Sequence, residues 1–292
     1  MSLRLEMMQV ARLAPKLLGV EASQLVSTFL NSQRHPAGGF ADRSGKSDLY
    51  YTVFALDSLI ALQLDLDRPE LRGYLATFSN GNGLDFVHRC CLARAWAALG
   101  ERPEQTLAIL EGVESFRTSD GGYHALPNQP FGSTYGAFLA VGAYQDLGRM
   151  VPEPLRLVQS LKFLETRDGA WANERSVPLG STNATAAAVT VLRQLNQPIN
   201  PAVGEWLLRR AHVQGGFCAA AGVPLPDLLS TATALHALAG LQTDFEALRE
   251  PCLDFVDSLW TNAGSFHGHW QEDTLDSEYT FYGLLASGHL SV

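Results

Sequence analysis

The sequence predicts an all-α protein, a closed (α/α)6 toroid in which six helical hairpins form an inner and an outer ring of helices. The first observation behind this is a repeat. Glycine-containing turns recur along the 292 residues, at 38–40, 80–83, 120–123, 168–171, 214–217 and 263–266. Self-similarity at a near-constant period is typical of repeat architectures. The second observation is that two different kinds of helix alternate between the turns.

The helix that follows each glycine turn is nearly uncharged, as in 181–195 and 230–241. A helix that is apolar or small on all sides is buried all round. The second helix of a repeat is amphipathic: in 152–167, Leu155, Val158 and Leu161 recur at helical spacing on one face. These patterns predict an inner ring of buried helices and an outer ring of helices that face solvent.

Residues typical of helix N-termini agree with the division into inner and outer helices. The outer helices begin near a proline, which suits the first turn of a helix; these are Pro69, Pro103, Pro152, Pro154 and Pro201. The inner helices open with a threonine in five of six copies, Thr52, Thr134, Thr182, Thr231 and Thr280, and with Arg89 in the second. Asp48 and Asp227 precede inner helices and are expected to cap their N-termini.

The ring is expected to close. An open solenoid needs polar-faced repeats at its ends, whereas the last copy, 264–286, is as regular as the others. A helix at about 20–33 supplies its missing outer partner. We expect one domain over 1–292, with a lead-in segment 1–19 and repeats at about 20–66, 67–101, 102–150, 151–198, 199–244 and 245–292.

Composition excludes several classes of partner. The chain has 46% apolar residues and carries 21 Lys and Arg against 30 Asp and Glu, a net charge of −9. Without a basic run it is a poor ligand for nucleic acid or an anionic membrane surface, and no apolar run approaches the ~20 residues of a membrane span. The four cysteines lack metal-finger spacing and are expected to be buried, reduced thiols of a cytoplasmic protein.

The topology has a chemical consequence. Every inner helix starts after a glycine loop, so all six N-termini face one mouth of the ring, where their partial positive charges favour an anion such as diphosphate. The interior is lined by small and aromatic residues that suit an apolar chain. Together these features describe an isoprenoid diphosphate.

Three stretches carry a family resemblance: DGGYHALPNQPFGSTYGAFLAV (120–141), DRSGKSDLYYT (42–52) and GSFHGHWQEDTLDSEYTFYG (264–283). They resemble repeats of the protein prenyltransferase β-subunit and squalene–hopene cyclase superfamily, the terpenoid cyclase and protein prenyltransferase toroids. The resemblance implies an isoprenoid bound in a central apolar cavity, transferase activity in isoprenoid metabolism and a helical partner subunit.

In protein prenyltransferases of this family, an Asp, a Cys and a His hold a zinc ion. On the matching motifs Asp276 falls on the Asp, Glu278 on the Cys and Tyr51 on the His. Zinc favours thiolate and imidazole, and this oxygen set suits Mg²⁺ or no metal. We therefore expect Asp276, Glu278 and Tyr51 as catalytic residues without zinc, with Asp276 and Glu278 as the ligands of any metal.

The resemblance also suggests substrate-binding residues. Arg43 and Lys46 keep the family's basic pattern, and His269 falls on a family arginine. An alternative for Lys46 is a solvated loop paired with Asp42 or Asp48. The full expected set is Arg43, Lys46, Asp48, His267, His269 and the aromatic residues Tyr50, Tyr135, Tyr279 and Tyr282. Half of the aromatic residues are expected to pack between the rings instead. His88, beside Asp48 or Asp85, is expected to be structural, and His236 to lie in the core or the cavity wall.

Other functions remain as alternatives. The protein could be a non-catalytic isoprenoid-binding or scaffold subunit. A terpene cyclase needs a D-x-D-D-T-A acid, and the nearest stretch, 227–232, keeps only Asp227. An (α/α)6 glycoside hydrolase needs paired carboxyls about 5–10 Å apart in an open cleft, with tryptophans that stack on sugars.

Overall fold

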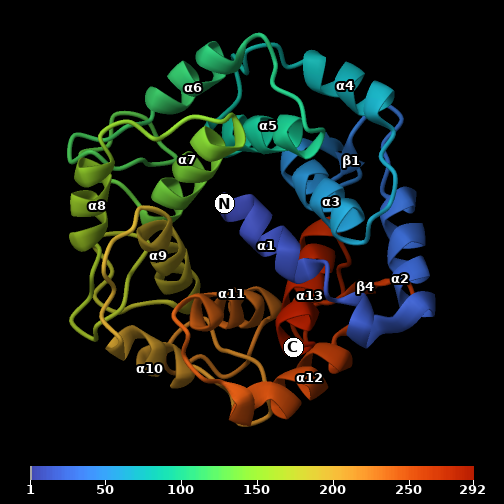
Figure 1. Cartoon of the computed structure of the whole chain (residues 1–292), viewed down its shortest axis with the longest axis vertical. Helices are drawn as coiled ribbons and strands as arrows, with labels where there is room; N and C mark the ends of the chain where they lie inside the picture. Colours follow the sequence, from blue (N-terminus) through green and yellow to red (C-terminus); the bar gives the residue numbers. More distant parts are fainter. Residues whose placement is uncertain (1) are drawn as a thin grey trace.

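A computed structural model describes residues 2–292 and shows the closed double ring that the sequence predicts (Figure 1). Residue 1 of the expected lead-in segment lies outside this range. The inner helices are α3 (Leu49–Ala61), α5 (Phe86–Ala98), α7 (Thr134–Asp146), α9 (Thr182–Gln194), α11 (Leu228–Gly240) and α13 (Ser277–Leu290). The outer helices are α2 (Pro15–Ser32), α4 (Arg68–Ala76), α6 (Thr106–Glu114), α8 (Pro154–Lys162), α10 (Ala202–Leu208) and α12 (Arg249–Ser258), the last preceded by the short 3-10 helix η1 (Glu246–Leu248).

Each inner helix packs against the next around the ring, and α13 packs against both α11 and α3. This contact closes the ring. The outer helix beside the junction is α2, which lies against α13 and α3. It begins at Pro15, earlier than expected, and Gly19 interrupts it with φ 73° and ψ −177°. The expected repeat divisions stay a prediction.

Short antiparallel strands lie beside the first and the last glycine turn. Strands β1 (Phe40–Ala41) and β2 (Ser47–Asp48) pair antiparallel, as do β3 (Trp260–Thr261) and β4 (Ser265–Phe266). At Gly39, φ is 68° and a Cβ would lie 2.8 Å from Thr52 Oγ1 and 2.6 Å from the Tyr74 ring. A side chain therefore cannot be placed there without moving the inner helix or the outer one.

In two repeats a threonine joins the glycine turn to the following inner helix. The Phe40 N–H donates to Thr52 Oγ1 (2.9 Å), and the Phe217 N–H donates to Thr231 Oγ1 in the same way (2.9 Å). Both threonines lie four residues after the helix cap. A backbone N–H that a strand partner would otherwise bind is thus satisfied by a side chain.

Thr134 and Thr182 differ from the other predicted threonines. Each is the first residue of its helix and donates across the repeat boundary, to the Ala172 carbonyl (2.7 Å) and the Cys218 carbonyl (2.6 Å). In the fourth repeat Thr185 takes the hairpin N–H of Trp171 instead (3.1 Å). The five threonines therefore occupy two different structural positions, although the sequence around them is similar.

A feature that the sequence did not predict is α1 (Leu3–Ala11), which lies inside the ring (Figure 1). It packs against α13, α3, α7 and α9. At Gly288 of α13 a Cβ would stand 2.1 Å from the Val10 carbonyl oxygen, so the two helices approach closely only because that residue is glycine. Part of the expected lead-in segment is thus a plug in the lumen.

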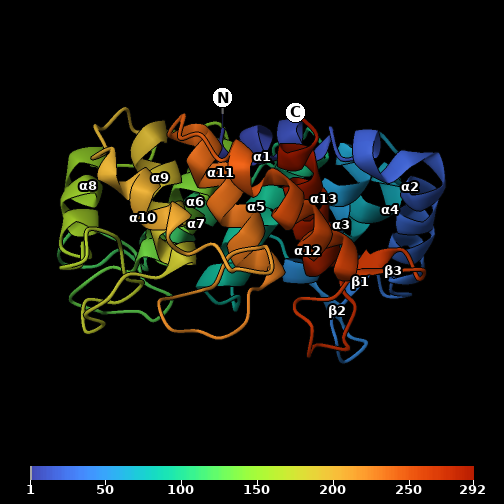
Figure 2. The same cartoon turned by 90° about the horizontal axis from the view of Figure 1, so that it is seen from below.

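Figure 2 shows the two ends of the ring. The long loops that precede the inner helices gather on one face, as predicted, and α1 and both termini lie on the opposite face. All four cysteines are buried and unpaired. Within residues 2–292, no helix combines the length and apolar character needed to cross a bilayer.

Candidate functional site

The inner-helix N-termini carry side-chain caps, most of them anionic. Asp48, Asp85, Asp227 and Asp276 cap α3, α5, α11 and α13, and serines cap α7 and α9. Asp48, for example, accepts the N–H groups of Tyr50 (2.7 Å) and Tyr51 (3.1 Å). Because the caps already take many free N–H groups, the helix ends offer less to an external anion than the topology alone suggests.

A cavity of about 170 Å³ lies between the inner helices. The residues of its wall recur at fixed distances from the helix caps. In five inner helices the second residue after the cap lines the cavity; these are Tyr50, Tyr135, Asn183, Leu229 and Glu278. Deeper positions, six and nine residues after the cap, supply further side chains such as Tyr282 and His236. Residues separated by three or four positions share one helix face. Counting from the cap residue of each inner helix would therefore identify the cavity-lining residues from the sequence.

A smaller lobe of about 50 Å³ adjoins this cavity, sharing Met7, Tyr50, Tyr135, Phe138 and Tyr282 with it. Its other lining residues include Arg94 and Asp146. Met7 belongs to α1, so the plug helix forms part of the wall of both lobes.

Glu278 and Tyr50 meet in the cavity wall. The Tyr50 hydroxyl donates to Glu278 Oε1 at 2.6 Å, joining α3 to α13 across the ring closure. Burial raises the pKa of Glu278, and the nearby Asp276 adds to this, while the bonds to Tyr50 and the charge of Arg43 oppose it without reversing it. A carboxyl with a raised pKa in an apolar cavity is suited to proton transfer.

Beside this pair, Arg43 neutralises the α13 cap. Its Nε donates to Asp276 Oδ2 at 2.7 Å, its guanidinium lies 5.1 Å from the centre of the Tyr279 ring, and Glu272 is 3.8 Å away. Asp276 is only 3% exposed, whereas Arg43 is 37% exposed. The predicted catalytic Asp276 is therefore engaged by a predicted substrate-binding residue.

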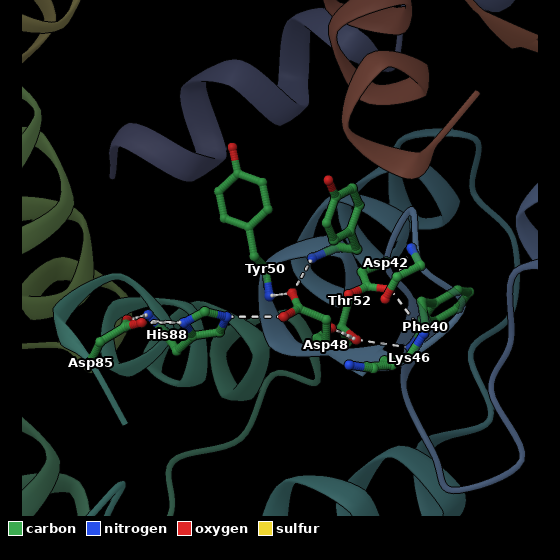
Figure 3. Close-up of polar contacts among 10 residues, drawn as sticks. Phe40, Asp42, Lys46, Asp48, Tyr50, Thr52, Asp85 and His88 are labelled. Carbon is green, nitrogen blue, oxygen red and sulfur yellow. Dashed lines mark hydrogen bonds and ion pairs between the residues drawn. The ribbon is translucent and has the colours of Figure 1, made fainter. Parts of the chain in front are cut away.

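His88 is held between two carboxylates, as Figure 3 shows. Its Nε2 lies 3.0 Å from Asp48 Oδ2 and its Nδ1 lies 2.9 Å from Asp85 Oδ1. The bond to Asp48 is the main reason that the pKa of His88 rises to about 9. Burial would raise the pKa of Asp48, but His88 and the Tyr51 N–H hold it below its usual value. His88 is thus an imidazolium at neutral pH. Its helix α5 lies two repeats round the ring from α13, which carries Glu278, with α3 between them.

The structure brings several of the predicted site residues together. Tyr50, Tyr135, Tyr282 and Glu278 line the cavity. The Tyr51 carbonyl accepts from the Ser277 hydroxyl (2.8 Å), which places Tyr51 beside the start of α13. Burial, and then the charge of Asp276, raises the pKa of the Tyr51 hydroxyl to about 12, so that group is neutral at pH 7.

The other predicted residues lie outside the cavity wall. Tyr279 packs under Arg43 and against Gly268. His269 accepts the Gln271 N–H within its own loop (3.1 Å), and His267 has a buried Nδ1 without a partner among the described residues. Lys46 is exposed on the β1–β2 loop, where Asp42 accepts its backbone N–H (2.8 Å; Figure 3). Among residues 2–292, no hydrogen bond or ion pair joins His269 to Tyr51 or Glu278.

The zinc ion that the resemblance implies does not fit these residues. Asp276 already binds the Arg43 guanidinium, Glu278 binds the Tyr50 hydroxyl, and both nitrogens of His88 face carboxylates. None of these positions supplies a thiolate, the ligand that zinc favours most. Within the described chain, no group of three or more His, Cys, Asp or Glu residues is arranged to hold a metal ion.

Sequence reasoning missed a buried charge cluster at the α1 end. Asp57 of α3 is fully buried and binds Arg4 Nε at 2.7 Å and Arg94 Nε at 2.7 Å. The Arg94 guanidinium also lies 5.1 Å from the centre of the Phe54 ring. The signal available in the sequence was Asp57, the one charge within α3, and Arg94 of α5, which stand at the same distance from their helix caps.

The family described as "Prenyltransferase alpha-alpha toroid domain" matches residues 6–73 and 182–290, together more than half of the chain. No match is found among curated proteins.

Solved structures share the fold at low sequence identity. Protein geranylgeranyltransferase-I from Candida albicans, complexed with GGPP, is 14% identical with a TM-score of 0.69, over 90% of this chain and 89% of that chain. The type II terpene cyclase MstE from Scytonema is 13% identical with a TM-score of 0.62, over 92% and 96%. A protein from Actinoplanes is 16% identical with a TM-score of 0.65, over 92% and 97%. At such identity the likeness shows the fold.

Proposed function

The chain belongs to the prenyltransferase alpha-alpha toroid family, and on that premise we propose that it binds a short allylic isoprenoid diphosphate in its central cavity and transfers the isoprenyl group to an acceptor. The observation that carries the proposal is the Glu278–Tyr50 pair in the wall of an otherwise largely apolar cavity. The apolar wall suits the hydrocarbon chain, and the pair supplies a group that can accept a proton beside it.

The chemistry proposed for the site has two steps. The carbon–oxygen bond of the allylic diphosphate breaks, the diphosphate leaves with the bonding electrons, and an allylic cation remains. The acceptor's nucleophilic atom then bonds to the cation, and Glu278 takes the proton that the acceptor loses. Aromatic faces of Tyr135 and Tyr282 in the cavity wall would stabilise the cation.

The charges at the mouth support this orientation. Arg43 and Lys46 lie on the loop face and are the basic groups closest in sequence to the start of α3. The helix ends contribute less, because aspartates cap four of them. In this proposal the diphosphate head is bound by Arg43 and Lys46, and Arg43 would exchange its contact with Asp276 for one with phosphate.

Cavity size favours a short chain. A cavity of roughly 150 Å³ is known to hold benzene, and the lumen here measures about 170 Å³ with α1 in place. A chain of five to ten carbons, about one or two isoprene units by this comparison, is consistent with the space. The 20-carbon GGPP in the fungal structure belongs to that protein.

The test is binding and turnover with dimethylallyl, geranyl, farnesyl and geranylgeranyl diphosphates, each labelled in the prenyl group. We expect dimethylallyl and geranyl diphosphate to bind. In the presence of an extract that contains the acceptor, we expect the protein to release a labelled product that has lost the diphosphate. The substitution Glu278→Gln keeps size and the Tyr50 contact but cannot accept the proton, so we expect product formation to fall about 10²-fold with binding retained.

A non-catalytic isoprenoid-binding protein is the second candidate. The observation that favours it is that both carboxylates are already engaged, Asp276 by Arg43 and Glu278 by Tyr50. Binding of the short diphosphates without release of diphosphate, and with no difference between the parent protein and Glu278→Gln, would support this candidate and reject the transferase. Absence of binding to all four compounds would reject both.

A further inference from the structure

His236 lies deep in the cavity wall. It belongs to α11, nine residues after the Asp227 cap, and is 5% exposed. Glu278 is only two residues after its own cap. With a rise of 1.5 Å per residue, the His236 level is about 10 Å further from the mouth than the Glu278 level. The cavity thus has a polar group near each end.

One nitrogen of His236 has a partner and the other does not. Nδ1 lies 3.1 Å from His289 Nε2 on α13. Nε2 has no hydrogen-bond partner among the described residues. An unsatisfied buried nitrogen costs about 1–3 kcal/mol, so native proteins rarely leave one without a role or a bound molecule.

The surrounding charges do not satisfy this nitrogen. The carboxyl whose charge acts on His236 is that of Glu6 on α1. Glu6 does not bind His236, because it accepts from Arg193 Nη1 (2.7 Å) and Gln194 Nε2 (2.9 Å) of α9. Burial lowers the pKa of both His236 and His289. The pair is therefore neutral at pH 7, and the free nitrogen of His236 can donate or accept according to the tautomer.

Neighbouring polar groups in the same wall are already satisfied. The Thr190 hydroxyl donates to the Ala186 carbonyl (2.8 Å), and the Thr233 hydroxyl donates to the Leu229 carbonyl (2.7 Å). His236 thus differs from these two threonines in having unused hydrogen-bonding capacity in the cavity wall.

From this arrangement we infer that the ligand of the cavity is an isoprenoid oxygenated at the end remote from its head group, and that His236 is the residue that binds this oxygen. The inference rests on the proposed function, which supplies the isoprenoid carbon skeleton of the ligand. It adds the substrate class, an isoprenoid with an oxygen at the remote end. His289 is a positioning residue, since its ring fixes the orientation of His236. A hydroxyl or carbonyl would satisfy Nε2, whereas a hydrocarbon terminus would leave it unpaired.

The test compares geraniol with 8-hydroxygeraniol, which differ only in a hydroxyl at the far end of the chain. Dissociation constants are measured by titration calorimetry for the parent protein and for His236→Leu, which keeps the volume and removes the nitrogen. Because one neutral hydrogen bond contributes about 1 kcal/mol, we expect the preference for 8-hydroxygeraniol over geraniol to fall about fivefold in His236→Leu.

Thr190→Val is the matched control. It lies at the same depth on α9 and lines the same cavity, but its hydroxyl is already bonded to the backbone. We expect it to keep the preference of the parent protein. His289→Leu, which releases the His236 ring, is expected to reduce the preference in part.

The outcomes separate the two proposals. If both alcohols bind the parent protein and the ratio of their dissociation constants is the same in His236→Leu, His236 does not bind the terminal oxygen and the inference is overturned. The same holds if Thr190→Val alters the ratio as much. If neither the alcohols nor the short diphosphates bind, the proposed function itself is rejected. If His236→Leu does not fold, His236→Gln is compared with the parent protein instead. Gln keeps a polar atom at this position, so we expect part of the preference to remain, and an unchanged ratio would overturn the inference.

Discussion

Two carboxylates hold the His88 ring at the start of α5, and a single residue thereby links two neighbouring repeats. Asp85 caps the same helix, α5, whereas Asp48 caps α3. His88 is a cation because each ring nitrogen can donate to an oxygen. The sequence indicated the companions Asp48 and Asp85, but it did not indicate that both would be used.

We expect His88→Gln to lower the free energy of unfolding in a pH-dependent way. The folded pKa, about 9, lies above the usual value of about 6.5, so the charged pair stabilises the fold fully below about pH 6.5 and this contribution is lost as the pH rises through about 9. The measurement is urea unfolding of both proteins between pH 6 and pH 10, where the difference should be largest at pH 6.

His212→Gln serves as the control, since His212 binds only the Gln214 N–H and no carboxylate within the described chain. It should show no such trend. A His88→Gln difference that stays constant across this range would contradict the charged state assigned to His88.

At the scale of elements, α1 is held in the ring by charge as well as by packing. Arg4 binds Asp57 of α3, and Glu6 binds Arg193 of α9. The Leu3 N–H also donates to Gln145 Oε1 of α7 (2.8 Å). Three inner helices therefore anchor one short helix that would not be stable alone in water.

Asp57→Asn is expected to destabilise the protein by about 3–5 kcal/mol, because it leaves Arg4 and Arg94 buried without their shared carboxylate. Chemical denaturation gives the value. The double variant with Arg4→Leu should recover part of the loss, since one of the two unpaired cations is removed. If Asp57→Asn costs less than 1 kcal/mol, the buried cluster does not hold α1 in place.

At the scale of the whole molecule, ring closure and the plug together set the size of the lumen. Six inner helices enclose it, and Met7 of α1 lines both of its lobes. The volume available to a ligand is thus a property of the assembled toroid and of no single repeat.

Met7→Ala is expected to lengthen the longest isoprenoid diphosphate that binds by about one isoprene unit, at a cost of roughly 2–5 kcal/mol in stability. Met8→Ala is the control: Met8 is also buried in the core but does not line either lobe. It should lose similar stability without altering chain length. Equal chain-length limits in both variants would show that α1 does not set the floor of the cavity.

Much of the architecture was predictable because it depends on local patterns. The glycine turns, the uncharged inner helices and the prolines at outer-helix starts each report on a few neighbouring residues. The capping roles of Asp48 and Asp227 followed from type and position and are confirmed. The candidate site was less predictable, since the motif register proposed Tyr51 as the catalytic tyrosine and the structure places the Tyr50 hydroxyl on Glu278.

The sequence by itself determined the number of repeats and the division into inner and outer helices, because helical period and turn chemistry are encoded within about 50 residues. The regular last copy also indicated that the ring closes. Only the tertiary structure decided which distant residues meet. Tyr50 and Glu278 are 228 positions apart, and Arg43 and Asp276 are 233 apart. Their contacts, and the insertion of α1 into the lumen, exist only after the ring has closed, when packing against several helices at once selects partners that no local pattern specifies.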